Sequence, residues 1–136
     1  MAFAAASCSS GSKDYLVDGL RSHQDEQRQL LSLLDKGTGD AETRFALMNR
    51  IADNLLAEGN KSNLIIFLTS SVERHPDDPY NAYWLMMVAH TYLEDGAPSI
   101  AGYYFRRILE NCQDLEIHGE SIHLICLQNL IKITSS

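Results

Sequence analysis

Apolar side chains recur every three or four residues along most of this chain, which is the spacing of one face of an α-helix. The clearest stripe lies between residues 41 and 58, at Phe45, Met48, Ile51 and Leu55. Stripes of this kind predict six helices, over residues 13–35, 41–58, 61–74, 80–95, 98–112 and 119–133. The pattern therefore predicts an all-α fold.

Residues that end or begin helices stand between these segments. Gly37–Gly39 follows the first segment, and Asp40 is suited to cap the helix that starts at residue 41. The apolar run at residues 64–68 could form a buried strand by itself. Its helical neighbours and the stop at His75 and Pro76 favour a helix instead.

The chain carries a degenerate internal repeat with a period of 37 residues. This shift aligns Met48 with Leu85, Ile51 with Val88, Ala52 with Ala89, Leu55 with Tyr92, Gly59 with Gly96 and Leu68 with Phe105. A second shift of 37 residues aligns Ile122, Ile125 and Cys126 with Leu85, Val88 and Ala89. We expect the small residues of this register, Ala52, Ala89 and Cys126, to lie where two helices cross closely.

These positions resemble the tetratricopeptide repeat, a helical hairpin of about 34 residues with a large, a small and an aromatic residue in its first helix. The second unit has Leu85, Ala89, Tyr92, Gly96, Ala101 and Phe105 at these places, and the first has Met48, Ala52, Leu55, Gly59, Leu68, Ser71 and Pro76. Leu55 and Leu64 depart from the family pattern, and Asp77–Pro79 lengthens the link. The resemblance covers residues 41–113 and implies antiparallel hairpins stacked as a short superhelix, whereas an unrelated helical bundle is the alternative.

In that family the first helix of each hairpin lines a concave groove. The resemblance places six residues there: Asn49, Arg50, Asp53, Tyr83, Met86 and His90. Asn49 and Arg50 would bind a carboxylate or a peptide backbone, and Tyr83 and Met86 would supply an apolar anchor. The alternative is that Met86 packs inward and that the charged residues form a solvated face.

Residues 1–12 differ from the rest, because they are small and polar with no helical period. The segment Ala4–Ser12 resembles the cleavage region of a bacterial lipoprotein signal, in which Cys8 would be lipidated. The alternative is an incidental cysteine in a flexible terminus, since few residues precede it. We expect residues 13–136 to form the helical domain. Lipidation would place the protein in the periplasm or cell envelope, and otherwise we expect it in the cytoplasm.

Composition narrows the classes of partner. The chain has 136 residues, the length of one domain, with 11 Lys and Arg against 18 Asp and Glu and a net charge of −7. Such an acidic protein is a poor ligand for nucleic acid. No apolar run is long enough to cross a membrane, so we expect membrane contact only through a lipid anchor.

One cluster contains residue types that bind zinc: Cys112, His118, His123 and Cys126. Their spacing is not that of the usual ligand pairs, so we expect no metal and no cofactor. A Cys112–Cys126 disulfide is an alternative in an exported protein, and two separate buried thiols are the simplest expectation. The sequence has no phosphate-binding loop, nucleophile elbow or metalloprotease motif, so we expect no enzymatic activity.

Together these features predict an adaptor or scaffold that binds another polypeptide, either free or as a membrane-tethered subunit of a larger complex. Ile117, Leu124 and Leu127 give the last helix more apolar surface than one buried face needs, which indicates self-association or docking on a larger assembly. The alternative function is binding of a small molecule or lipid between the hairpins for a transport system.

Overall fold

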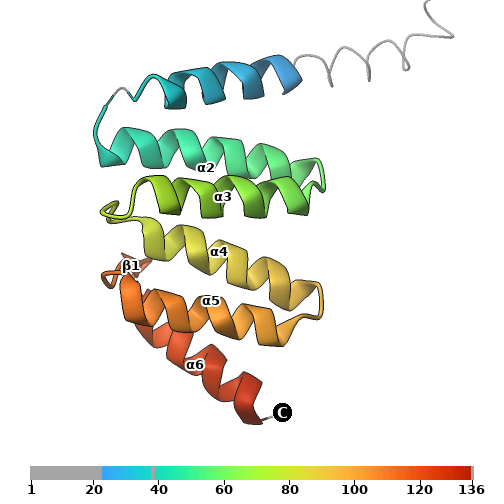
Figure 1. The fold of residues 1–136 in the computed structure, drawn as a ribbon, viewed down its shortest axis with the longest axis vertical. Helices are drawn as coiled ribbons and strands as arrows, with labels where there is room; N and C mark the ends of the chain where they lie inside the picture. The colour runs from blue at the N-terminus through green and yellow to red at the C-terminus, as the bar shows by residue number, and fades with distance from the viewer. Residues whose placement is uncertain (1–22, 38, 136) are drawn as a thin grey trace, which may run out of the picture. The chain divides into compact units, whose positions relative to one another are not determined.

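The computed structural model describes residues 23–37 and 39–135, and the helices predicted there are present (Figure 1). A first helix covers residues 23–35. It is followed by α2 (Ala41–Ala57), α3 (Lys61–Arg74), α4 (Asn81–Glu94), α5 (Pro98–Asn111) and α6 (Ile122–Ser135), with a two-stranded hairpin of β1 (Glu116–Ile117) and β2 (Glu120–Ser121) before α6. The all-α prediction is confirmed for the part of the chain that the structure describes. The described residues belong to two compact units, which meet in the sequence between Asn54 and Leu55.

The first unit contains helix 23–35 and α2 as far as Asn54. Asp40 caps α2 as predicted, because its Oδ1 accepts a hydrogen bond from the Thr43 backbone N–H at 2.9 Å. Hydrogen bonds from Thr43 also hold the pKa of the Asp40 carboxyl below its ordinary value. On α2, Met48, Ile51 and Ala52 are buried, as the apolar stripe predicts.

The second unit is organised around α4. This helix contacts α3, α5 and α6, and α5 also contacts α6. Trp84, Val88 and Ala89 of α4 are fully buried, and so is Phe105 of α5. Burial of large aromatic and aliphatic side chains is the main stabilising contribution in a helical unit of this size.

Two turns at equivalent places of the 37-residue register have the same geometry. Gly59 and Gly96 have φ values of 72° and 77°, a left-handed conformation that favours glycine. The next residues close the turns with the same bond: Asn60 N donates to Leu55 O, and Ala97 N donates to Tyr92 O, both at 2.9 Å. Helices α2 and α4 therefore both end in a Schellman motif. The two turns that the 37-residue shift aligns in the sequence also have the same hydrogen bonds in the structure.

The register also aligns buried small residues. Ala52, Ala89 and Cys126 are each 0 % exposed, as expected for positions at which a larger side chain would keep neighbouring helices apart. This agreement supports a shared packing role for the three positions.

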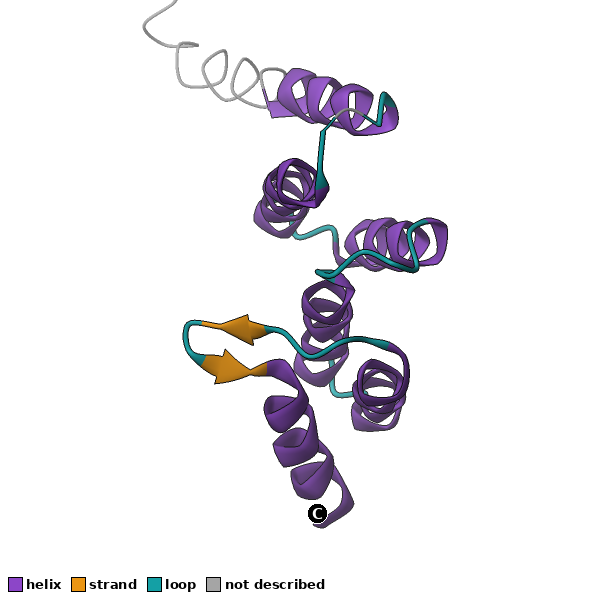
Figure 2. Ribbon diagram, turned by 90° about the vertical axis from the view of Figure 1, so that its left-hand side faces the viewer, coloured by secondary structure: helices purple, strands orange, loops and turns teal. Residues whose placement is uncertain are grey.

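The hairpin at residues 116–121 was not predicted, and α6 begins three residues later than the expected 119 (Figure 2). Ile117 pairs with Glu120 across a two-residue turn in which His118 and Gly119 have φ values of 53° and 79°. Two consecutive positive φ angles are typical of the tight turn that joins antiparallel strands. Asp114 then caps α6, because its Oδ1 accepts from His123 N at 2.9 Å and its Oδ2 from Ser121 Oγ at 2.6 Å.

Candidate functional site

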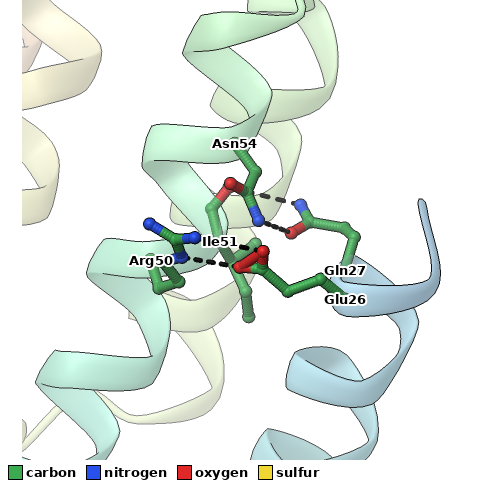
Figure 3. Close-up of polar contacts among 5 residues, drawn as sticks. All are labelled: Glu26, Gln27, Arg50, Ile51 and Asn54. Atoms are coloured by element: carbon green, nitrogen blue, oxygen red, sulfur yellow. Dashed lines mark hydrogen bonds and ion pairs between the residues drawn. The ribbon is translucent and has the colours of Figure 1, made fainter. Parts of the chain in front are cut away.

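The residues predicted to bind a partner lie in both units, and each set is described in its own unit. In the first unit, Arg50 forms a two-pronged ion pair with Glu26 of helix 23–35 (Figure 3). Arg50 Nε donates to Glu26 Oε1 at 2.6 Å, and Nη2 donates to Oε2 at 3.1 Å. In this structure Arg50, which the sequence predicts to bind a partner's carboxylate, is paired within the chain, and its side chain is still 58 % exposed. The guanidinium does bind a carboxylate, but the carboxylate belongs to the same chain.

A second contact between the same two helices was missed by the sequence analysis. Asn54 Nδ2 donates to Gln27 Oε1 at 2.8 Å, and Gln27 Nε2 donates to the Ile51 carbonyl at 3.2 Å (Figure 3). Asn54 is only 5 % exposed, so its amide needs partners within the protein. Its place three residues after Ile51, on the apolar stripe of α2, is the signal that could have revealed this role.

The contact of helix 23–35 with α2 should depend on pH, because it includes the Arg50–Glu26 ion pair. The hydrogen bond from Arg50 holds the pKa of the Glu26 carboxyl below its ordinary value of 4.5. The stabilisation of helix 23–35 against α2 is therefore complete above that value and is lost as the pH falls through the lowered pKa. We expect the side-chain amide signals of Gln27 and Asn54 to shift in NMR spectra as the pH is lowered from 6 to 3, and the protection factors of the backbone amides in helix 23–35, corrected for the intrinsic exchange rate, to fall.

The control for this titration is the Glu26→Gln variant. It has no carboxyl at this position, so its Gln27 and Asn54 signals are expected to be nearly independent of pH over the same range. A wild-type protein whose signals titrate no differently from those of this variant would contradict the assignment.

The other two predicted residues of the first unit, Asn49 and Asp53, remain candidates. Asp53 is exposed and Asn49 is half-buried. Asp53 also helps to raise the pKa of the Arg50 guanidinium, so its charge lies in the field of the Arg50–Glu26 pair.

In the second unit one of the three residues predicted on the outer face of α4 is buried. Met86 is only 9 % exposed, which agrees with the alternative that this residue packs inward. The reason is that α4 contacts three other helices, which leaves a narrow outer strip. That strip contains Tyr83, Met87 and His90, four and three residues apart on one helical face.

The two predicted residues on this strip pack over the aromatic core. The Tyr83 ring meets Trp84 edge to face with centroids 5.1 Å apart, and the exposed His90 ring meets Phe105 in the same way at 5.9 Å. Tyr83 and His90 are therefore held in place by buried rings. Met87 is half-buried on the same strip and was not predicted.

The outer face of α6 exposes a row of large aliphatic side chains. Leu124, Leu127 and Ile131 are 54 %, 48 % and 64 % exposed. The expectation that this helix has more apolar surface than its buried face needs is confirmed. Ile117 is half-buried, and Ile131, the most exposed member, was not singled out from the sequence.

The cysteines of the second unit are both free, so the Cys112–Cys126 disulfide is not formed. Burial raises the pKa of the Cys112 thiol, and burial together with the nearby Cys112 raises the pKa of Cys126 to about 12. His123 Nε2 lies 2.9 Å from the Cys112 carbonyl oxygen, and this contact links the start of α6 to the end of α5. Within residues 23–37 and 39–135, no three His, Cys, Asp or Glu side chains are placed to hold a metal ion.

Cys8, the predicted lipidation site, lies outside the described residues. Among the helices that the structure describes, none is both long and apolar enough to cross a bilayer. The chain matches no protein-family model, no curated protein and no solved structure.

Proposed function

We propose that the protein is a non-catalytic adaptor that binds another polypeptide through the outer face of α6. The observation that carries this proposal is the row of Leu124, Leu127 and Ile131, each about half exposed or more. Their spacing of three and four residues places them on one side of the helix, as in helices that dock into apolar grooves. Exposing so much contiguous apolar surface to water is costly for a helix that stays without a partner.

The charge of the chain favours a different polypeptide over a second copy. Each copy carries a net charge of −7, so two copies repel one another. The apolar row itself contains no charged residue, and Lys132 beside it is the one cation of α6. The partner that fits best presents an apolar groove or helix face and is neutral or basic around it.

The likeness to the tetratricopeptide repeat supports the same class of function, since that family binds polypeptides. That likeness rests on the 37-residue register of the sequence. In this proposal Tyr83, Met87 and His90 of α4, with Asn49 and Asp53 of α2, are secondary contact residues. Tethering through an acylated Cys8 is part of the proposal and rests on residues 4–12 of the sequence alone.

Replacing Leu127 by aspartate tests the proposal. We expect the Leu127→Asp protein to keep the helical circular dichroism of the wild type, because the side chain is exposed, and to lose its partner. In quantitative affinity capture from cells that naturally make the protein, one identified protein should fall at least about tenfold, because a charge is placed in a desolvated apolar contact.

The matched control is Ile66→Asp on α3, because Ile66 is 60 % exposed in the same unit. This variant should retain the captured protein. Equal capture by the wild type and both variants would contradict the proposal. If light scattering shows that the wild type is a dimer and that the Leu127→Asp protein is a monomer, the outer face of α6 binds a second copy of this chain, and the proposal of a different partner is contradicted.

A further inference from the structure

A polar cleft of about 520 Å³ opens at one end of the second unit, and no residue of α6 lines it. Its walls come from the end of α3, the link between α3 and α4, the start of α4 and the end of α5. The volume is in the range of small-ligand sites. None of the cleft residues belongs to the apolar row of α6, so the two surfaces can be tested independently.

The link between α3 and α4 is held rigidly by hydrogen bonds. Asp78 N donates to His75 O at 3.1 Å, and Asn81 N donates to Asp78 O at 3.2 Å. Asp78 Oδ1 accepts from Tyr80 N at 2.9 Å, and Pro76 and Pro79 restrict the backbone on either side. The cleft is therefore preformed, and a ligand does not have to order this wall.

The side-chain amide of one nearly buried residue lines the cleft and uses only one of its two N–H groups within the protein. Asn81 is 5 % exposed, and its Nδ2 donates to His75 O at 2.8 Å. This bond fixes the amide and leaves Oδ1 as an acceptor that receives no hydrogen bond from any residue in the described part of the chain. The amide is therefore held in one orientation, with its oxygen able to accept a hydrogen bond from a ligand N–H.

The charges around the cleft favour a cation. Glu73, Asp77 and Asp78 contribute three carboxyl groups to its lining, against the single guanidinium of Arg107. Neither Glu73 nor Asp77 forms an ion pair or a side-chain hydrogen bond with another described residue. Cys112 adds no charge at neutral pH, because burial raises its pKa.

Apolar groups complete the lining and suit a ligand with an alkyl stem. Val72 and Leu85 line the cleft beside the carboxylates, together with Pro76 and Pro79. Lysine and arginine side chains combine such a stem with a cationic head that donates several hydrogen bonds.

We propose that this cleft binds an alkylguanidinium or alkylammonium group, with Asn81 Oδ1 and the carboxylates of Glu73 and Asp77 as acceptors and Val72 and Leu85 against the alkyl stem. Two sources present this chemistry: an arginine or lysine side chain of a polypeptide, or a free basic amino acid. The inference goes beyond the proposed adaptor function.

The probe is N-acetyl-arginine methylamide, titrated into the full-length protein at low ionic strength and followed by NMR. Its matched control is N-acetyl-citrulline methylamide, which has the same shape without the charge. We expect saturable binding of the arginine compound, with the Asn81 side-chain amide among the shifted signals, and binding of the citrulline compound weaker by roughly fivefold or more.

Two variants connect this binding to the cleft, and two further variants serve as controls. Glu73→Gln and Asp77→Asn should each lower the affinity for the arginine compound by roughly threefold or more, because each removes one carboxylate from a site that excludes part of the solvent. Glu110→Gln, an exposed change on α5 outside the lining, should leave the affinity unchanged. Leu127→Asp should also leave it unchanged, so that a failure of the adaptor proposal does not affect this test.

A second arm with free L-arginine separates the two sources. Equal affinity for the free and capped compounds indicates a polypeptide side chain. A clear preference for the free amino acid, lost in Arg107→Gln, indicates a free amino acid whose carboxylate binds Arg107. The proposal is overturned if neither arginine compound saturates, if citrulline binds equally well, or if Glu73→Gln and Asp77→Asn have no effect.

Discussion

Replacing Phe105 by alanine is expected to lower the free energy of unfolding of the second unit by about 3–5 kcal/mol. The ring is 0 % exposed and meets the His90 ring edge to face at 5.9 Å. Its removal leaves a cavity between α4 and α5, and the rigid backbones of two packed helices can fill such a cavity only in part.

Urea titration followed by tryptophan fluorescence measures this change. Trp84 is the one tryptophan of the chain and lies in the second unit, so its signal reports the unfolding of that unit. The matched control is Tyr103→Ala on the same helix, where the side chain is 53 % exposed and the expected loss is below about 1 kcal/mol. Equal losses for the two variants would contradict the assignment of Phe105 to the core.

The second large effect is the protection of Cys126 from thiol reagents. Its side chain is 0 % exposed, and its pKa is raised to about 12. Only about 10⁻⁴ of such a thiol is ionised at pH 8, and the thiolate is the reactive form. Cys112 is half-buried and has a smaller barrier to reagent access.

This protection is measured with a chromogenic disulfide reagent in a Cys8→Ser background. The native protein should release about one equivalent of chromophore, from Cys112, and a second equivalent only when urea unfolds the unit. Peptide mapping identifies the labelled residue. Rapid labelling of Cys126 in the native protein would show that the contact of α6 with α4 and α5 opens readily, contrary to the close packing described above.

The helices were predictable because their signal is local. Apolar residues at three- and four-residue intervals, a capping Asp40 and turn glycines such as Gly59 and Gly96 specify α2 to α5 to within about two residues. The β-hairpin escaped prediction because its strands are two residues long and cannot show alternation. Its turn at His118 and Gly119 depends on a positive φ at a histidine, which no pattern in the sequence announces.

The candidate site was harder to predict, because it depends on which helices lie around each residue. Met86 and Met87 are indistinguishable by composition, and only the number of helices that surround α4 decides that Met86 is buried. The intrachain partner of Arg50 could not be foreseen, because Glu26 lies 24 residues earlier in the sequence. The exposed residues of α6 were found more readily, because an apolar helix with too many leucines and isoleucines must expose some of them.

The cleft could not have been found from the sequence. Glu73, Asp77 and Arg107 come from α3, a link and α5, and they line one cavity only after α3, α4 and α5 have packed. Asn81 would have been assigned to the helix start, where asparagine is common. Its unused oxygen is visible only when the bond of its nitrogen to His75 O is known.

Site-specific photocrosslinking at Leu127 determines whether the outer face of α6 binds another protein. A photoreactive amino acid replaces Leu127 in cells that naturally make the protein, and a second strain carries it at Ile66. We expect one defined adduct from position 127, identified by mass spectrometry as a protein other than this chain, and no such adduct from position 66. An absence of adducts at Leu127, or the same adducts at both positions, would contradict a partner-binding surface on α6.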